Sequence, residues 1–385
     1  MVTFFLCVIF LAFISLGLPD SGMGVMWPYM RLDFGANVSL AGLITITVTV
    51  MSSISSVVCI RLSRKVNVGT ITAVSSMLTA VGMLGYSISG AFWQVCVFAM
   101  LTGFGGGGVD ATLNDYVAKH YSSRIMNWLH SCWGLGAMLS PIIMTGALNA
   151  SGSWRSGFLI VGIAQATMAI MFFFTSKFWK KESKVAEKEE LSPLAPQMTM
   201  KNLAPWLSIL CFFLYCGIEM INGVWLKTLL YETRELGTNL SSAAVSVFFG
   251  AIMVGRIIIG LFSNKLGNRN AIRIGICVAM LGFVLLTIKS TILCLCAALF
   301  IGLGLAPIYP ALMHETALRF NKKTAGNTIG LQMAAANLGI LVIPVAFGFI
   351  AEKTSFEIMP YVAGVILLVL IVVSEKLNSL TKRQL

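Results

Sequence analysis

The chain is short of charge: only 11% of its 385 residues are Asp, Glu, Lys or Arg, whereas 57% are hydrophobic. A soluble domain carries roughly 25% charged residues, which it needs to cover its surface. The scarcity of charge therefore excludes an ordinary water-soluble domain. Because a membrane-spanning helix needs about 20 mostly apolar residues, a lipid bilayer is the solvent that suits this composition.

The chain also lacks the residue clusters that metal, disulfide or nucleophilic chemistry needs. Its nine cysteines all lie inside apolar runs, and its three histidines are scattered at positions 120, 130 and 314. Zinc sites and disulfide frameworks require cysteine and histidine at characteristic short spacings. We therefore expect buried free thiols, no metal and no cofactor. A membrane enzyme is disfavoured, and the absence of an ATP-binding motif points to an ion gradient as the source of energy.

Apolar runs recur along the chain with short polar breaks between them. The chain begins with the run MVTFFLCVIF and no basic leader, so we expect a membrane span there and not a cleaved signal peptide. The spans must be helical, because irregular backbone cannot satisfy its hydrogen bonds in lipid. The runs predict twelve transmembrane helices near residues 3–28, 38–60, 68–89, 92–118, 125–149, 155–177, 204–230, 240–262, 271–288, 291–317, 325–350 and 358–375.

One long polar stretch, KKESKVAEKEELSPLAPQMTMKN (180–202), interrupts the series. It is charged, contains proline and has few apolar residues, which is typical of a flexible linker. We therefore predict an all-α membrane protein with an N-terminal six-helix bundle (1–178), a cytoplasmic linker (179–203) and a C-terminal six-helix bundle (204–385).

The distribution of basic residues predicts the orientation. With the N-terminus placed in the cytoplasm, 20 of the 27 Lys and Arg residues fall on the cytoplasmic side and six, Lys227 among them, on the outer side. This bias is a positive-inside signal, so we expect a multi-pass protein of the cell membrane with both termini cytoplasmic. The net charge of +12 follows from this topology. The expected partners are the lipid bilayer and a small solute, not nucleic acid, and we expect a monomer.

The two halves repeat. At an offset of 199 residues, PDSGMGV (19–25) aligns with IEMINGV (218–224), so that Asp20 corresponds to Glu219. Gly103 and Gly105 correspond at the same offset to Gly302 and Gly304, and SRKV and LGAMLSP match SNKL and LGILVIP at offsets of 200 and 203. Such repeats are typical of secondary transporters, whose substrate site lies near the midplane between the halves.

The stretch GFGGGGVDATLND (103–115) fits the dinucleotide-binding pattern G-x-G-x-x-G. That pattern needs a preceding strand and a βαβ unit, neither of which fits inside a membrane span. Gly103 and Gly107 are four residues apart, a spacing that lets helix backbones approach closely in membranes. We therefore interpret the glycines as a helix-packing surface, and Asp110 and Asn114 beside it as the candidate functional residues of this stretch.

Six stretches carry a family resemblance: SLGLPDSGMGVMWPYM (15–30), GFGGGGVDATLNDYVA (103–118), NWLHSCWGLGAMLSPI (127–142), GIEMINGVWL (217–226), VGRIIIG (254–260) and GLGLAPIYPAL (302–312). The chain resembles the major facilitator superfamily and, within it, the fucose permease-like sugar:proton symporters. The loops RLSRKVNVG and SNKLGNR are degenerate forms of the superfamily's loop signature and lack its acidic residue. In the fucose permease-like family, acidic residues in the first and fourth spans are associated with proton coupling and sugar binding. The resemblance implies those roles for Asp20 and for Asp110, where the family usually has glutamate.

Three carboxylates are the candidates for proton coupling or substrate binding: Asp20, Asp110 and Glu219. An isolated charge inside the membrane costs about 2.5 kcal/mol or more, so each group must face a cavity, pair with a cation or stay protonated. The structural alternative for Asp20 is a role as a helix cap. The structural alternative for Glu219 is an ion pair with Arg256, although the estimated depths favour a structural pair between Arg256 and Glu315.

Further polar and aromatic residues are candidates to line the cavity. Asn114 is one turn from Asp110, Trp133 offers an apolar face for a sugar ring, and His130 could relay protons. Helix-packing hydrogen bonds and an interfacial aromatic belt are the structural alternatives. The predicted lining consists of Asn114, His130, Trp133, Asn222, Trp225, Gln332 and Asn337.

Together these features predict a secondary active transporter that moves a small polar solute, a sugar, by alternating access coupled to protons. An exporter of drugs or metabolites with the same fold is the main alternative. A membrane receptor that does not transport is a further one.

Overall fold

The computed structural model describes residues 2–63, 65–121, 123–176, 179, 201–320 and 322–381. Within these ranges all regular structure is helical, without a β-strand. Most of the predicted linker 179–203 lies outside the described residues.

The described residues of the first half of the chain form six long helices and one short 3-10 turn, η1 (Val38–Leu40). The long helices are α1 (Val2–Asp33), α2 (Ala41–Ser63), α3 (Val68–Ile88), α4 (Phe92–His120), α5 (Ser123–Ser151) and α6 (Trp154–Thr175). Within this N-terminal bundle α2 and α3 pack on α4, α3 packs on α6, and α1 packs on α5.

The second half forms seven helices: α7 (Leu203–Thr228), α8 (Thr238–Leu266), α9 (Asn268–Leu286), α10 (Thr291–Leu305), α11 (Ile308–Arg319), α12 (Lys322–Lys353) and α13 (Met359–Leu380). Two short elements join them, the π-helical turn η3 (Leu229–Thr233) and the 3-10 turn η4 (Phe356–Ile358). Within this C-terminal bundle α7 packs on α12 and α13, and α10 packs on α8 and α9.

Twelve stretches of the described chain are long and apolar enough to cross a membrane, as predicted. One prediction needs correction. The expected continuous helix 291–317 is divided into α10 and α11 at Ala306 and Pro307. Proline has no amide hydrogen to donate and its ring obstructs the preceding turn, so a helix breaks readily there.

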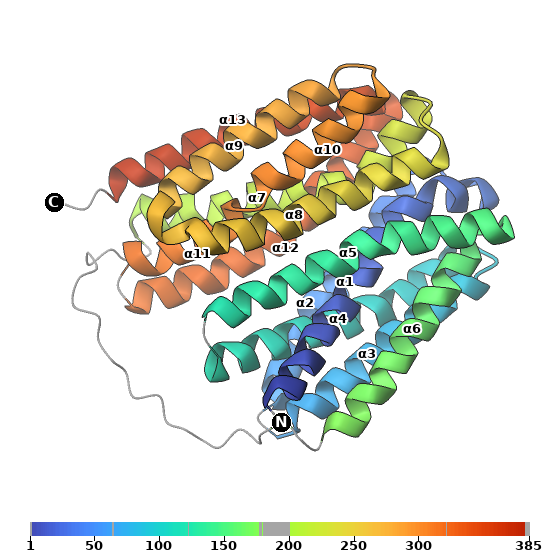
Figure 1. Ribbon diagram of the computed structural model, residues 1–385, viewed down its shortest axis with the longest axis horizontal. Coiled ribbons are helices and arrows are strands. Elements are labelled where there is room, and N and C mark those ends of the chain that lie inside the picture. The colour runs from blue at the N-terminus through green and yellow to red at the C-terminus, as the bar shows by residue number, and fades with distance from the viewer. Residues whose placement is uncertain are drawn as a thin grey trace.

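The beginning of α1 and the end of α13 lie at the same end of the molecule (Figure 1), which we call the terminal end. The end that carries the connection between α1 and α2 is the opposite end. The two bundles meet along α5 and α8, α2 and α12, and α1 and α7. At the opposite end they are joined by a hydrogen bond between the hydroxyls of Tyr29 and Thr238 (2.6 Å) and by one from Asn149 to Asn239 (2.7 Å). An ion pair between Arg31 and Glu232 (2.7 Å) adds to them.

The sequence repeat reappears as a repeat of close helix contacts. A Cβ atom on Gly103 of α4 would collide with the carbonyl of Val48 on α2. A Cβ atom on Gly302 of α10 would collide with the carbonyl of Phe248 on α8, which lies 200 residues after Val48. Gly105 against Ser75 and Gly304 against Gly275 form a second equivalent pair of contacts. The repeated glycines therefore preserve the same backbone approach in both bundles.

The glycines of GFGGGGVDATLND have the predicted packing role. Gly107 lies against the carbonyl of Ser52 on α2, one turn along from Gly103 and its contact at Val48. Gly103 and Gly107 therefore form one small-residue face on α4 that brings the backbone of α2 into contact.

Candidate functional site

The two bundles touch near their centre where α1 crosses α7. A Cβ atom on Gly24 would meet the carbonyl oxygen of Gly223, its equivalent in the repeat. Asp20 and Glu219 each lie one turn before their glycine, on the side toward the terminal end. Asp20 is close enough to Glu219 for their charges to interact. The repeat therefore brings two equivalent carboxylates together below the crossing.

Asp20 is accessible although it lies well inside α1. Its side chain is exposed, and its Oδ2 accepts a hydrogen bond from the indole Nε1 of Trp133 on α5 (2.6 Å). Asp20 also lies within electrostatic range of Asp110 on α4. Because its neighbours come from α4, α5 and α7, the exposed carboxylate faces the space between the bundles. It does not act as the helix cap that was the alternative interpretation of this residue.

Asp110 faces the same space from α4. Its side chain is exposed, and its Oδ1 accepts a hydrogen bond from Nδ2 of Asn114 (2.8 Å), one turn along the helix. Tyr309 on α11 lies within electrostatic range of Asp110 from the other bundle. The carboxylate and amide of α4 are therefore presented together, as the spacing of these two residues predicts.

Glu219 is paired, unlike the two aspartates. Its Oε1 lies 3.3 Å from Nη2 of Arg256 on α8, and the two side chains are only 12% and 11% exposed. The guanidinium carbon of Arg256 lies 5.6 Å from the ring centroid of Trp133, within the range of a cation–π contact. Trp133 therefore links Asp20 in one bundle to the Arg256–Glu219 pair in the other.

The predicted pair between Arg256 and Glu315 is wrong. Glu315 contacts Arg269 (3.2 Å) and Arg319 (3.0 Å) at the terminal end of the C-terminal bundle. Arg256 lies ten residues before the end of α8, about 15 Å from that end, whereas Glu315 lies four residues before the end of α11, about 6 Å from its end. Arg256 is therefore about 9 Å deeper than Glu315, and it meets Glu219 of α7 instead.

His130 lies near this line of residues on α5. It is half-buried, its ring meets Phe13 edge to face at 5.7 Å, and it is within electrostatic range of Arg256. A proton relay through His130 stays a prediction. Asn337 is half-buried on α12, and its role in lining the cavity also stays a prediction.

Three predicted cavity residues are packed inside the C-terminal bundle instead: Asn222, Trp225 and Gln332 are each fully buried. Trp225 donates from Nε1 to the carbonyl of Pro344 (2.8 Å), and Asn222 donates to the carbonyl of Ile218 (2.8 Å). Each step of three residues, from Glu219 to Asn222 and from Asn222 to Trp225, falls about 60° short of a full helical turn. Trp225 is therefore rotated by about 120° from the face of Glu219.

Gln332 is a helix-packing amide, which was the structural alternative to a place in the cavity lining. Its Nε2 donates to the hydroxyls of Ser208 (2.7 Å) and Thr316 (2.8 Å), which joins α12 to α7 and α11. An amide that bridges three helices in this way stabilises packing in the membrane.

Tyr309 belongs to the site but was absent from the sequence prediction. It follows the break between α10 and α11, packs against Phe212 (5.2 Å) and Tyr215 (5.9 Å), and is within electrostatic range of Glu219. A signal for it existed: GLGLAPIYPAL (302–312) combines glycine and proline inside a span. Transporters use such discontinuous helices to build their binding sites.

Lys227 was also missed, because it was counted among the basic residues of the outer side. It lies on α7 one turn past Gly223, toward the opposite end, and is 1% exposed. Its Nζ has no hydrogen-bond partner among the described residues and lies 4.8 Å from the ring centroid of Tyr29. The helix crossing therefore separates Lys227 from the carboxylates on its other side.

Comparison with known proteins agrees with this architecture. Residues 6–331 match the family model of the Major Facilitator Superfamily. The glucose/mannose transporter GlcP of Bacillus subtilis is 22% identical over 317 residues, covering 80% of this chain and 77% of that protein. The class H tetracycline resistance protein of Pasteurella multocida is 24% identical over 356 residues, covering 86% and 85%.

Among solved structures, a bacterial homologue of the human lysosomal transporter Spinster, inward-facing and unoccupied, superposes with a TM-score of 0.80. The match covers 98% of this chain and 97% of the other at 11% identity, which shows the fold. The family match, spanning most of the chain, identifies a multi-pass membrane transporter and not an enzyme. The chain therefore belongs to the Major Facilitator Superfamily.

Proposed function

We propose that the protein is a secondary active transporter of the plasma membrane that takes up a small polar solute, a sugar, together with protons. Both termini lie in the cytoplasm in this proposal, as the positive-inside bias indicates. The two bundles alternate about the crossing of α1 and α7, so that the carboxylates below it face one side of the membrane at a time.

The contacts between the bundles support an inward-facing state for this structure. Tyr29–Thr238, Arg31–Glu232 and Asn149–Asn239 tie the bundles together at the opposite end. Asp20 and Asp110 remain exposed on the other side of the crossing. With the termini in the cytoplasm, both aspartates are reached from inside, and the outward-facing state requires these three contacts to break.

The observation that carries the proposal is the line Asp20–Trp133–Arg256–Glu219 across the two bundles. Glu219 already has a cation beside it, whereas Asp20 is bonded to a neutral indole and lies near Asp110. Closing the bundles around two unpaired carboxylates is opposed by repulsion and lost hydration. A proton on this aspartate pair removes part of that opposition, which couples proton binding to alternation.

A sugar fits the groups that face the space. Sugar hydroxyls can bond to the carboxylates and to the amide of Asn114, and a pyranose ring can lie on the apolar part of Trp133. The similarity to a protein named as a glucose/mannose transporter supports this substrate class.

Uptake by the purified protein in proteoliposomes tests the proposal. A panel of labelled hexoses is offered with and without an imposed inward proton gradient. Wild type is expected to accumulate at least one sugar in the presence of the gradient. Asp20→Asn should lose this accumulation but retain exchange of sugar across the membrane, while Asp33→Asn, the same change at the far end of α1, should behave like wild type. Equal behaviour of wild type and Asp20→Asn would overturn proton coupling at Asp20.

Export of drugs or metabolites is the second candidate, because the chain is similar over 86% of its length to a tetracycline resistance protein. Expression in a drug-sensitive bacterium separates the two functions. Increased resistance with energy-dependent efflux of the compound, and no sugar uptake in proteoliposomes, would favour the exporter.

A further inference from the structure

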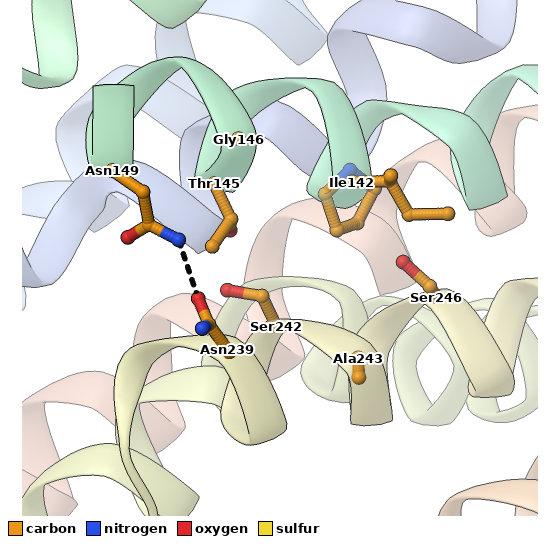
Figure 2. Close-up of a pocket in the computed structure, with 9 residues that line it drawn as sticks. Ile142, Thr145, Gly146, Asn149, Asn239, Ser242, Ala243 and Ser246 are labelled. Carbon is orange, nitrogen blue, oxygen red and sulfur yellow. Dashed lines mark hydrogen bonds between the residues drawn. The ribbon is translucent and has the colours of Figure 1, made fainter. Parts of the chain in front are cut away.

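A groove of about 260 Å³ with an uncharged, largely apolar lining lies between α5 and α8 near the opposite end of the molecule (Figure 2). The hydrogen bond from Asn149 to Asn239 spans the two helices at one end of it. The lining contains apolar, hydroxyl and amide side chains and no charged residue. The groove is separate from the carboxylates, which lie on the other side of the α1–α7 crossing.

The groove faces the membrane and not the central space. Ile142, which lines it, is nine residues after Trp133 on α5. Nine residues make about two and a half helical turns, which places the two side chains on opposite sides of the helix. Trp133 points at Asp20, whereas Ile142 is 57% exposed, as expected for an isoleucine in contact with lipid.

Three buried hydroxyls in the groove have no partner. Thr145, Ser242 and Ser246 are 6%, 2% and 7% exposed, and none of their hydroxyl oxygens has a hydrogen bond to a described residue. Serine and threonine in helices usually bond to a carbonyl of the preceding turn, as Ser241 does to Gly237 (3.1 Å). Other buried hydroxyls, such as those of Ser76 and Ser374, also lack a partner among the described residues. Three such costly groups line this one groove, and their clustering points to a polar ligand.

The depth of these groups along the helices bears on which ligand could reach them. Ser242 lies four residues into α8, Thr145 six residues before the end of α5 and Ser246 eight residues into α8, so the three hydroxyls are about 6–12 Å from the helix ends. The interfacial layer of a bilayer is about 5–7 Å thick on each side, and the ester groups of lipids lie at its boundary with the hydrocarbon. Measured from the helix ends, the groove therefore begins at head-group level beside Asn149 and Asn239 and reaches past the level of the ester groups.

We propose that this groove binds the glycerol–ester region of a membrane lipid. The hydroxyls of Thr145, Ser242 and Ser246 donate to the ester oxygens, and an acyl chain continues past Ile142. The uncharged lining selects for this neutral part of the lipid and not for a charged head group. Because α5 and α8 belong to different bundles, a bound lipid bridges them beside the Asn149–Asn239 bond and stabilises the state closed at the opposite end.

Lipid-dependent thermal stability of the purified protein tests this proposal independently of transport. The detergent-solubilised full chain is titrated with dioleoyl phosphatidylethanolamine, and the melting temperature is measured at each concentration. Gly146 lines the groove, and a Cβ atom there would meet nothing within 4 Å, so Gly146→Leu fills the groove with little disturbance of the helices. The triple variant Thr145→Val, Ser242→Ala, Ser246→Ala removes the donors and keeps the space.

The wild-type melting temperature is expected to rise with lipid, and both variants should lose that rise. Gly330→Leu is the matched control, because Gly330 is another helical glycine with open space around it; it should keep the rise. An unchanged rise in Gly146→Leu or in the triple variant would overturn the proposal. A rise that soluble glycerol or glycerophosphoethanolamine reproduces in full would assign the groove to a free polyol and overturn the lipid as its occupant.

Discussion

Gly24 of α1 and Gly223 of α7 bring the backbones of the two bundles into contact at their central crossing. The two glycines occupy equivalent positions in the halves of the chain. Two carboxylates, Asp20 and Glu219, lie one turn to one side of this contact, and Lys227 lies one turn to the other. The crossing therefore separates the acidic part of the centre from the buried amine.

Replacing Gly24 by alanine should weaken this contact, because the new methyl group would collide with the carbonyl of Gly223. Overpacking of this kind costs about 1–3 kcal/mol. We expect a lower melting temperature and slower uptake. Gly330→Ala, where a Cβ atom meets nothing within 4 Å, is the control and should leave both unchanged. A Gly24→Ala protein as stable and active as wild type would show that the contact between α1 and α7 can accommodate a methyl group.

The Arg256–Glu219 pair should behave as a buried ion pair. Removing one partner leaves an uncompensated charge in a largely buried site, so Arg256→Gln and Glu219→Gln should each destabilise by about 3–5 kcal/mol. The double variant Arg256→Gln, Glu219→Gln should recover much of that loss. Thermal unfolding of the four proteins in a double-mutant cycle measures the coupling. Losses that simply add in the double variant would mean that the two charges do not interact.

Lys227→Met should stabilise the inward-facing protein. The amine is buried without a hydrogen-bond partner in the described part of the chain, and leaving a buried donor unsatisfied costs about 1–3 kcal/mol, or more when the group is charged. Methionine has a similar length and no such penalty. We expect a higher melting temperature, with Lys289→Met, whose side chain is 70% exposed, as a control near zero. A lower melting temperature in Lys227→Met would indicate a favourable interaction of the ammonium in this state.

Trp133→Phe should keep an aromatic ring at this position and remove the hydrogen bond to Asp20. Hydrogen bonds to charged groups contribute about 1.5–3 kcal/mol, so Asp20 should be held less firmly and proton-driven uptake should fall. Trp128→Phe is the matched control on the same helix, because Trp128 is 46% exposed. Uptake kinetics at several external pH values provide the measurement. A pH profile and rate identical to wild type would exclude a positioning role for the indole.

Much of the fold was predictable because it depends on local composition and on the repeat. The number of spans follows from apolar runs, and the pairing of Asp20 with Glu219 follows from an offset of 199 residues. The packing role of the glycines near Asp110 could also be predicted from the sequence, since a spacing of four residues places Gly103 and Gly107 on one helix face. The break before Tyr309 had a signal in its prolines, but the side chain's approach to Glu219 depends on how α11 packs after that break.

The sequence by itself determined that this chain spans a membrane with twelve segments in two related halves, because hydropathy and internal similarity act along the chain. Only the tertiary structure decided which polar side chains face the space between the halves. Trp225 and Gln332 are buried inside the C-terminal bundle, and Arg256 pairs with Glu219 and not with Glu315. Lys227 is buried on the far side of the contact between Gly24 and Gly223. The physical reason is that helix rotation and length set which residues meet. Rotating a helix by about 100° about its axis, or moving a residue two turns along it, changes which side chains it contacts, and neither can be read from composition.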